Sequence, residues 1–310
     1  MPTHPVTATS TDTLTRSAVS APVGPRKMAR RVSVPLVALV GIWLVLAASP
    51  WGRSLDLAAY AGRFETGRRL HMVNAAVLNV VNGTTLFVGM LTLGVVGAST
   101  RKVAFAARAV GAVLVSVFGA EFLKLALPHA GVVDPVWTWT GGGSFPSGHT
   151  TIAASMSLAV LGVSSNAWRL RLAGPLLAWT VLTATATIAA GWHRPSDVLG
   201  GLAMAALGYQ LMQARGHRHA SLRNCLPMAG WLTPAKDWAR PALWWVIATT
   251  AVVWGAVPVP GSGDSLADSS AVLYLGALGA IAVGAVLTFT SSGHLAHDGP
   301  RLERTTARTA

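Results

Sequence analysis

Residues 141–150 read GGGSFPSGHT, a turn that leads into an apolar run. Pro146 and Gly148 interrupt regular structure, and Ser147 is a residue type that caps the start of a helix. We expect the backbone N–H groups of Ser147, Gly148 and His149 to point outward unpaired, where an anion such as phosphate binds well. His149 would then stand at the rim of this cradle.

Residues 191–200 read GWHRPSDVLG and form a second turn of the same kind. Pro195 and Ser196 mark a helix start, and Asp197 lies four residues after His193, so its carboxylate can reach one nitrogen of the imidazole. That contact would fix the tautomer and leave the other nitrogen free to attack or to accept a proton. Either motif alone is usually a helix cap or a surface residue, but the two together predict a functional site.

The distance between the two histidines along the chain indicates how they meet. His193 follows His149 by 44 residues. This spacing suits one apolar helix that leads away from the first turn, a tight loop and a second helix that returns. We therefore expect both turns to lie on the same side of the apolar layer.

The composition is that of an integral membrane protein. The 310 residues are 52% hydrophobic and 11% charged, with a mean hydropathy of +0.50, whereas a soluble domain carries about 25% charged residues. The formal net charge is +13, which is compatible with nucleic-acid binding, but the distribution of the charge points to membrane topology instead. The single cysteine, Cys225, excludes an intramolecular disulfide.

The chain divides into a tail, an apolar core, a basic loop and a second apolar region. Residues 1–31 are rich in Ser, Thr, Pro and Ala, and we expect a disordered cytoplasmic tail. Residues 32–213 form the expected membrane core. Residues 214–239 form a basic cytoplasmic loop, residues 240–290 two extra transmembrane helices, and residues 291–310 a cytoplasmic tail.

We expect eight transmembrane helices in an all-α bundle. Most of the apolar runs are long enough to cross a hydrocarbon layer of about 30 Å. The first is expected to be an uncleaved anchor, with signal-peptide cleavage near Ala47 and Ala48 as the alternative. Arginines mixed with Leu, Ala and Val over 55–81 predict an amphipathic surface helix. The expected spans are 32–49, 83–99, 107–127, 149–165, 172–191, 196–213, 240–257 and 269–290.

Positive charge is unevenly distributed between the two sides of these spans. With the N-terminus placed in the cytoplasm, 18 of the 24 Lys and Arg residues fall inside and five fall outside, with Lys124 near an outer helix end. An excess of Lys and Arg marks the cytoplasmic side, so both termini are expected inside. We expect an integral protein of the cell membrane whose two histidine turns face outward, and no nucleic-acid partner.

Of the eleven acidic residues, only Glu121 and Asp197 fall within or at the edge of the predicted core spans. Charged groups in a membrane are costly and are usually functional or paired. Glu121 and Lys124 are three residues apart on one predicted helix and can pair with each other. In the structural interpretation the pair stabilises the helix end. In the functional one, Lys124 offers its ammonium to an anionic headgroup and Glu121 orients it.

The PSGH sequence, the later HRPSDVLGG and a lysine on the preceding helix together resemble the type 2 phosphatidic acid phosphatase family. The family contains membrane lipid phosphatases and soluble haloperoxidase relatives, and the resemblance covers roughly residues 55–213. It implies a six-helix lipid-phosphatase-like core, to which this chain adds two C-terminal transmembrane helices. It also implies a membrane lipid phosphate as substrate and no cofactor or metal. It does not indicate an oligomeric state.

The resemblance assigns roles to individual residues. His193 would be the nucleophile that forms a phosphohistidine, and Asp197 would orient it. His149 would protonate the leaving lipid oxygen and then help to activate water. Lys124 would hold the phosphate oxygens together with the Ser147 and Gly148 backbone. Covalent catalysis would then combine with electrostatic stabilisation of an oxyanion.

The sequence departs from the family pattern at two places. The arginine expected six residues before the nucleophile is Thr187, and an expected Arg-Pro pair is Gly131 and Val132. His129 or Arg194 are the candidates to replace these phosphate contacts. Loss of two bidentate contacts should weaken transition-state binding by several kcal/mol. Three functions therefore stay open: a lipid phosphatase or pyrophosphatase, a phosphotransferase, and a non-catalytic binder or transporter of lipid phosphates.

Overall fold

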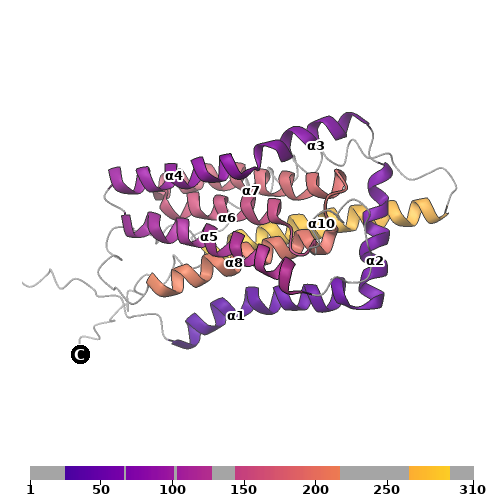
Figure 1. The fold of residues 1–310 in the computed structure, drawn as a ribbon, viewed down its shortest axis with the longest axis horizontal. Coiled ribbons are helices and arrows are strands. Elements are labelled where there is room, and N and C mark those ends of the chain that lie inside the picture. The colour runs from indigo at the N-terminus through magenta and orange to yellow at the C-terminus, as the bar shows by residue number, and fades with distance from the viewer. Residues whose placement is uncertain (1–24, 66–67, 101–102, 128–143, 217–264, 294–310) are drawn as a thin grey trace, which may run out of the picture.

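The computed structural model describes residues 25–65, 68–100, 103–127, 144–216 and 265–293, and every regular element in these ranges is a helix (Figure 1). This confirms the all-α membrane bundle expected from the sequence. The helices are α1 (Pro25–Ile42), which runs on into a π-helical segment (Trp43–Ala48), α2 (Pro50–Ala61), α3 (Arg68–Val80), α4 (Gly83–Ser99), α5 (Val103–Ala126), α6 (Gly148–Val163), α7 (Asn166–Ala189), α8 (Pro195–Gly216) and α10 (Ser265–Gly293), with a 3-10 turn at Gly62–Glu65.

Helix α8 is the central element of the bundle. It packs against α1, α5, α6 and α10, and every residue from 201 to 210 is buried. A helix that is apolar on all sides can be surrounded by other helices without leaving polar groups unpaired. The core that α8 shares with α6, α7 and α10 contains large aliphatic side chains such as Leu177, Ile188, Leu202 and Ile281.

A glycine allows α5 and α8 to approach each other closely. A Cβ atom at Gly208 of α8 would lie 2.2 Å from Ser116 Oγ and 3.0 Å from the Ala112 carbonyl oxygen, both on α5. Small residues at such crossings let helix backbones come together within a membrane. This contact holds the helix that carries Lys124 against the helix that follows His193.

Several helices are built to cross a membrane. Four of those described are long and apolar enough: Ala29–Ala48, Val103–Ala126, Arg171–Ala189 and Ser270–Thr290. Residues 73–80 and Gly83–Ser99 pass the same test as a pair bent by 48°. Helix α6 has 16 residues, which spans about 24 Å at 1.5 Å per residue, so it is short for a full crossing. The expected span at 240–257 lies outside the described residues.

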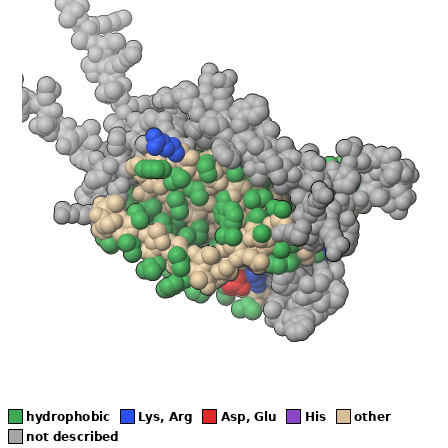
Figure 2. Space-filling model, turned by 90° about the horizontal axis from the view of Figure 1, so that it is seen from above, with side chains coloured by type: hydrophobic (Ala, Val, Ile, Leu, Met, Phe, Trp, Pro, Cys, Tyr) green, Lys and Arg blue, Asp and Glu red, His purple; other side chains and the backbone are tan. Residues whose placement is uncertain are grey.

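The outer surface of the bundle carries apolar side chains, as a lipid-facing surface should. Figure 2 shows one face on which hydrophobic side chains predominate and charged side chains lie toward the edges. Exposed hydrophobic residues of α4 and α5 include Phe87, Leu91, Val95, Phe118 and Phe122.

The prediction of a single surface helix over 55–81 is wrong. The structure has two separate helices there, α2 and α3, joined in part by the 3-10 turn. Helix α2 crosses one end of the bundle, whereas α3 lies beside α7 and leads into α4 (Figure 1). The residues of α2 that are buried include Asp56, Ala59 and Tyr60, so this helix is packed into the protein and does not simply lie on the membrane.

The predicted site residues gather at one end of the bundle. Lys124 in the last turn of α5, the start of α6, the end of α7 and the start of α8 share one end. Arg108 and Arg169, near the starts of α5 and α7, lie toward the other end. This arrangement matches the antiparallel path that the spacing of the two histidines predicted.

Candidate active site

The chain reaches His193 through a tightly capped helix end. At the end of α7, the Gly191 amide donates to the Ile188 carbonyl (2.9 Å) and the Trp192 amide donates to the Thr187 carbonyl (2.9 Å). These two bonds form a Schellman motif, which requires a left-handed residue just past the helix. Gly191 supplies it, with φ of 77°. We call residues 190–194 the His193 turn.

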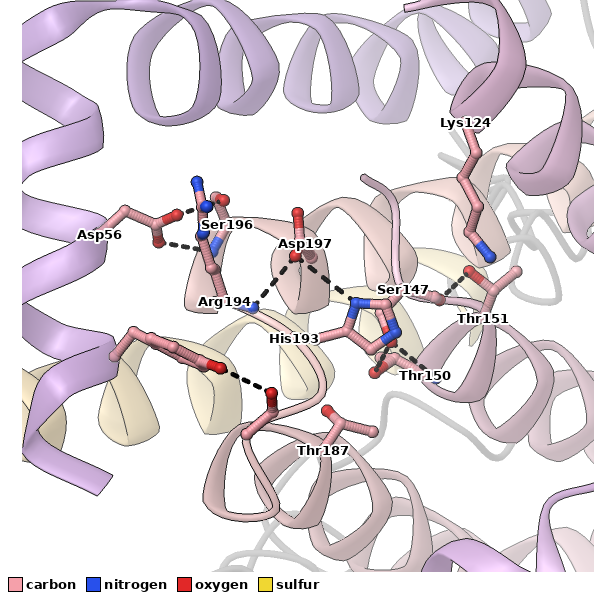
Figure 3. Close-up of polar contacts among 12 residues, drawn as sticks. Asp56, Lys124, Ser147, Thr150, Thr151, Thr187, His193, Arg194, Ser196 and Asp197 are labelled. Carbon is pink, nitrogen blue, oxygen red and sulfur yellow. Dashed lines mark hydrogen bonds and ion pairs between the residues drawn. The ribbon is translucent and has the colours of Figure 1, made fainter. Parts of the chain in front are cut away.

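Asp197 holds this turn from the start of α8. Its Oδ2 accepts a hydrogen bond from the Arg194 amide (3.0 Å) and lies 3.5 Å from His193 Nδ1. The first contact is half of a capping box, in which a side chain in the first turn satisfies the amide of the capping residue. Both His193 and Asp197 are buried. The opposite edge of the imidazole faces the start of α6 (Figure 3).

Ser147 caps α6, but its amide is not free as the sequence suggested. The Ser147 side chain accepts a long hydrogen bond from the Thr150 amide (3.4 Å), and the Ser147 amide donates to the Asp197 carbonyl (2.8 Å). The expectation of an unpaired Ser147 N–H was wrong because α8 packs directly against this turn. A Cβ at Gly201 of α8 would lie 2.8 Å from the Ser147 carbonyl oxygen, so the approach depends on glycine.

The amides that remain for an anion are those of Gly148 and His149, because the first residues of a helix lack intrahelical acceptors. Lys124 lies beside them. A Cβ at Gly148 would be 3.2 Å from Lys124 Nζ and 3.3 Å from Glu121 Oε1. Lys124 Nζ also donates to Glu121 Oε1 (2.7 Å), so the predicted pair forms. The Glu121 carboxylate partly neutralises the Lys124 ammonium at the place where an anion would bind.

His149 stands where the two turns meet. It is the second residue of α6, and its ring packs edge-on against Trp192 of the His193 turn, with 5.1 Å between ring centroids. His193 and Lys124 both lie close enough to His149 to interact with it electrostatically. The structure therefore brings together four predicted residues from α5, α6 and the α7–α8 connection: Lys124, His149, His193 and Asp197.

Other predicted residues do not join this group. The Arg194 side chain extends toward Asp56 and away from Lys124 (Figure 3). Thr187 is buried, and its hydroxyl donates to the Ala184 carbonyl (2.7 Å), so it does not replace a phosphate-binding arginine. His129 lies outside the described residues, as do Gly131 and Val132.

Asp56 was not predicted from the sequence, although it contacts this part of the molecule. Its carboxylate is buried and accepts hydrogen bonds from Ser196, the residue next to Asp197. Burial raises the pKa of Asp56 to about 6, although the hydrogen bonds from Ser196 act in the opposite direction. The sequence feature that points to Asp56 is its spacing of four residues from Tyr60, which places both on one helix face. Neither residue lies near the two histidine motifs in the sequence, so the spacing alone did not connect them to the site.

Among the described residues, no group of three or more His, Cys, Asp and Glu side chains has an arrangement that could hold a metal ion. The titratable and polar groups near His193 are instead suited to binding an anion, through Lys124 and the α6 amides, and to holding an imidazole in one orientation, through Asp197.

Comparison with known proteins supports the family that the motifs suggest. No curated protein and no solved structure matches the chain. Residues 105–217 match the family model of the PAP2 superfamily. The match includes α6, α7 and α8 with both histidine motifs, and it begins within α5 before Lys124. Residues 105–217 are therefore similar to the PAP2 superfamily, and this match supports a type 2 phosphatidic acid phosphatase-like family for that part of the chain.

Proposed function

We propose that this protein is a metal-independent membrane phosphatase that hydrolyses a lipid phosphate or pyrophosphate through a phosphohistidine on His193. The observation that carries the proposal is the position of the His193 ring. One edge lies beside the Asp197 carboxylate, and the other faces the start of α6, where Lys124 lies. A phosphate held by Lys124 and the α6 amides would meet the Nε2 edge of the His193 ring.

In the first step, Asp197 holds the proton of His193 on Nδ1, so that the lone pair of Nε2 is available. Nε2 attacks phosphorus, and the bond from phosphorus to the bridging oxygen breaks. Burial lowers the pKa of His149 to about 4, so the negative charge of the bound phosphate must keep it protonated, and it gives that proton to the leaving oxygen. Lys124 and the amides of Gly148 and His149 stabilise the negative charge on the phosphoryl oxygens in the transition state.

In the second step, water hydrolyses the phosphohistidine. His149, now neutral, takes a proton from the water, and the water oxygen attacks phosphorus. The bond to Nε2 breaks and inorganic phosphate leaves, so that His193 returns to its starting state. One residue acting first as an acid and then as a base is the usual pattern for two-step hydrolysis.

The substrate is expected to be a lipid of the outer leaflet. The apolar helices support a substrate embedded in a bilayer, and the family match supports a phosphate-containing one. The excess of Lys and Arg on the other side of the spans supports a site that faces outward. Prenyl pyrophosphate, phosphatidic acid and phosphatidylglycerol phosphate are the candidates for assay.

The test uses purified full-length protein in detergent with EDTA and these three lipids. We expect phosphate release by the wild type, and a loss of at least about a thousand-fold in His193→Ala, because removing a nucleophile has effects of this order or larger. Labelling with ³²P should give an acid-labile, base-stable phosphoenzyme that His193→Ala lacks. His149→Ala should still form it, but more slowly. Wild-type rates in His193→Ala would rule out the mechanism.

A second candidate function is a non-catalytic binder of lipid phosphates. It is favoured by Thr187, whose buried hydroxyl bonds to its own helix where the family has a phosphate-binding arginine. Tight binding of a phosphorylated lipid without turnover of any headgroup would support this function over the phosphatase.

A further inference from the structure

Helix α2 contacts the α7–α8 connection on both sides of His193. On one side, Asp56 Oδ1 accepts from the Ser196 amide (2.9 Å) and Oδ2 accepts from the Ser196 hydroxyl (2.6 Å). On the other side, the Tyr60 hydroxyl donates to the Gly191 carbonyl (2.6 Å). Gly191 precedes His193 by two residues and Ser196 follows it by three. Figure 3 shows Asp56 directed at Ser196.

Both contacting side chains come from the same face of α2. Asp56 and Tyr60 are four residues apart, so they project from one face of α2, and both are buried. The Tyr60 ring is braced by Arg63, whose guanidinium lies 3.5 Å from the ring centroid. A Cβ at Gly191 would lie 3.1 Å from Arg63 Nε, so the His193 turn also lies close to the 3-10 turn that follows α2.

We propose that Asp56 and Tyr60 are positioning residues that clamp the His193 turn between α7 and α8. The inference rests on the proposed function, because it assigns their purpose to the reaction of His193. Neither side chain reaches the phosphate in this role. They act through Gly191 and Ser196, which fix the backbone on either side of the nucleophile. Helix α2 lies outside the segment that matches the family.

The clamp also extends to the phosphate-binding turn. Ser196, held by Asp56, is followed by Asp197, whose carboxylate lies beside His193 and whose carbonyl accepts from the Ser147 amide. A shift at Ser196 therefore moves the group that orients the nucleophile and the start of α6 together. Displacements of about 1 Å in such arrangements can lower rates by about a hundred-fold.

A purely structural role for α2 predicts something different. A helix needs no buried carboxylate to pack against the end of a bundle, and burying one is costly unless it is hydrogen-bonded. Here both carboxylate oxygens are used on Ser196. If α2 only stabilised the fold, Asp56→Ala would speed amide exchange throughout the molecule. If Asp56 clamps the His193 turn, the same substitution should speed exchange mainly in that turn.

The first test is hydrogen exchange on the full-length protein in detergent micelles, which needs no substrate. We expect Asp56→Ala and Tyr60→Phe to speed amide exchange in peptides covering 190–198 and 145–151, with the middles of α5 and α7 unchanged. Tyr209→Phe and Ser157→Ala are matched controls. Both alter buried side chains away from this turn, and neither should change exchange in these peptides.

The second test measures turnover of the best lipid found in the phosphatase assay. We expect kcat about 10- to 100-fold lower in Asp56→Ala, with KM within about twofold, because orientation is lost and binding is kept. Asp56→Asn should recover part of the loss, since its amide oxygen can still accept from the Ser196 amide. Adding Ser196→Ala to Asp56→Ala should cost no more, because both remove the same contact.

The outcomes separate the two proposals. Unchanged exchange at 190–198, or exchange that rises equally throughout the protein, would overturn the clamp. Faster local exchange with kcat unchanged would overturn its catalytic purpose. If His193→Ala stays fully active, the proposed function fails, while the exchange result still decides whether α2 holds the turn. Should Asp56→Ala not fold, Asp56→Asn and Tyr60→Phe carry the same tests.

Discussion

At the scale of single residues, the same few side chains serve both the fold and the proposed chemistry. Asp197 caps α8 through the Arg194 amide and lies beside His193. Thr187 offers its carbonyl to the end of α7, while its hydroxyl bonds within its own helix. A helix cap and a catalytic orienting group need the same geometry here, because His193 sits one residue before the capping position of α8.

Asp56 gives a prediction at this scale. Burial raises its pKa from 3.8 to about 6, with the nearby Asp197 adding to the rise and Arg194 opposing it. A carboxyl group with a raised pKa in the folded state binds protons more tightly there than in the unfolded chain. Its contribution to stability is therefore full below about pH 4 and is lost as the pH rises through about 6.

We expect the melting temperature of the wild type, relative to that of Asp56→Asn, to fall between about pH 4 and 6 and then to level off. Thermal unfolding of both proteins in detergent across this range measures the difference. The asparagine variant is the control, since it cannot titrate at this position. A difference that grows as the pH rises would mean that Asp56 is stabilised as a carboxylate, contrary to the effect of its burial.

At the scale of the elements, small residues decide which helices can meet. Gly208 lets α8 approach α5, and Gly201 lets α8 approach the Ser147 turn. Because α8 follows the His193 turn, these contacts determine where His193 lies relative to Lys124 and the start of α6. The packing of α8 along its length thus determines the position of His193 at its start.

Gly208→Ala should destabilise the protein by about 1–3 kcal/mol, the usual cost of overpacking a close contact. The added Cβ would lie 2.2 Å from Ser116 Oγ, so Ser116→Ala should restore part of the loss. Gly276→Ala in α10, where a Cβ meets nothing within 4 Å, is the matched control and should not destabilise. Denaturant unfolding in micelles measures all four proteins, and equal stability of Gly208→Ala and wild type would contradict the packing argument.

At the scale of the whole molecule, the bundle has two unlike ends. The end with α2 holds the four grouped residues together with Arg63 and Arg194, whereas Arg108 and Arg169 lie near the helix starts at the other end. The proposed lipid phosphatase would meet its substrate at one leaflet. The distribution of Lys and Arg along the sequence predicts that this leaflet is the outer one.

Cysteine labelling tests this orientation. In a Cys225→Ser background, Ser54→Cys places a thiol on α2 and Ser165→Cys places one at the start of α7, and both serines are exposed. We expect a membrane-impermeant maleimide to label Ser54→Cys in intact cells. Ser165→Cys should react only after the membrane is permeabilised. The reverse pattern would place the proposed active site on the cytoplasmic side.

Much of this architecture is determined by local sequence. The apolar run over 83–99 coincides with α4, and the limits of α6 and α8 fall within three residues of the expected ones, whereas α7 begins six residues earlier than expected. The grouping of Lys124, His149, His193 and Asp197 also follows from the sequence. Alternating helices of this length return the chain to the same side, so motifs at helix ends meet there.

Only the tertiary structure decided how residues 55–81 divide into two helices, which residues of α2 are buried, and what the Ser147 amide binds. The break within 55–81, the burial of Asp56 and Tyr60, and the Ser147 amide bound to Asp197 depend on contacts between distant segments. Ser196 and Asp56 are 140 residues apart. The period and composition of a segment determine its own helix and its apolar face. They do not determine which residue of another helix will lie opposite a given hydrogen-bonding group, because that depends on how the whole bundle packs.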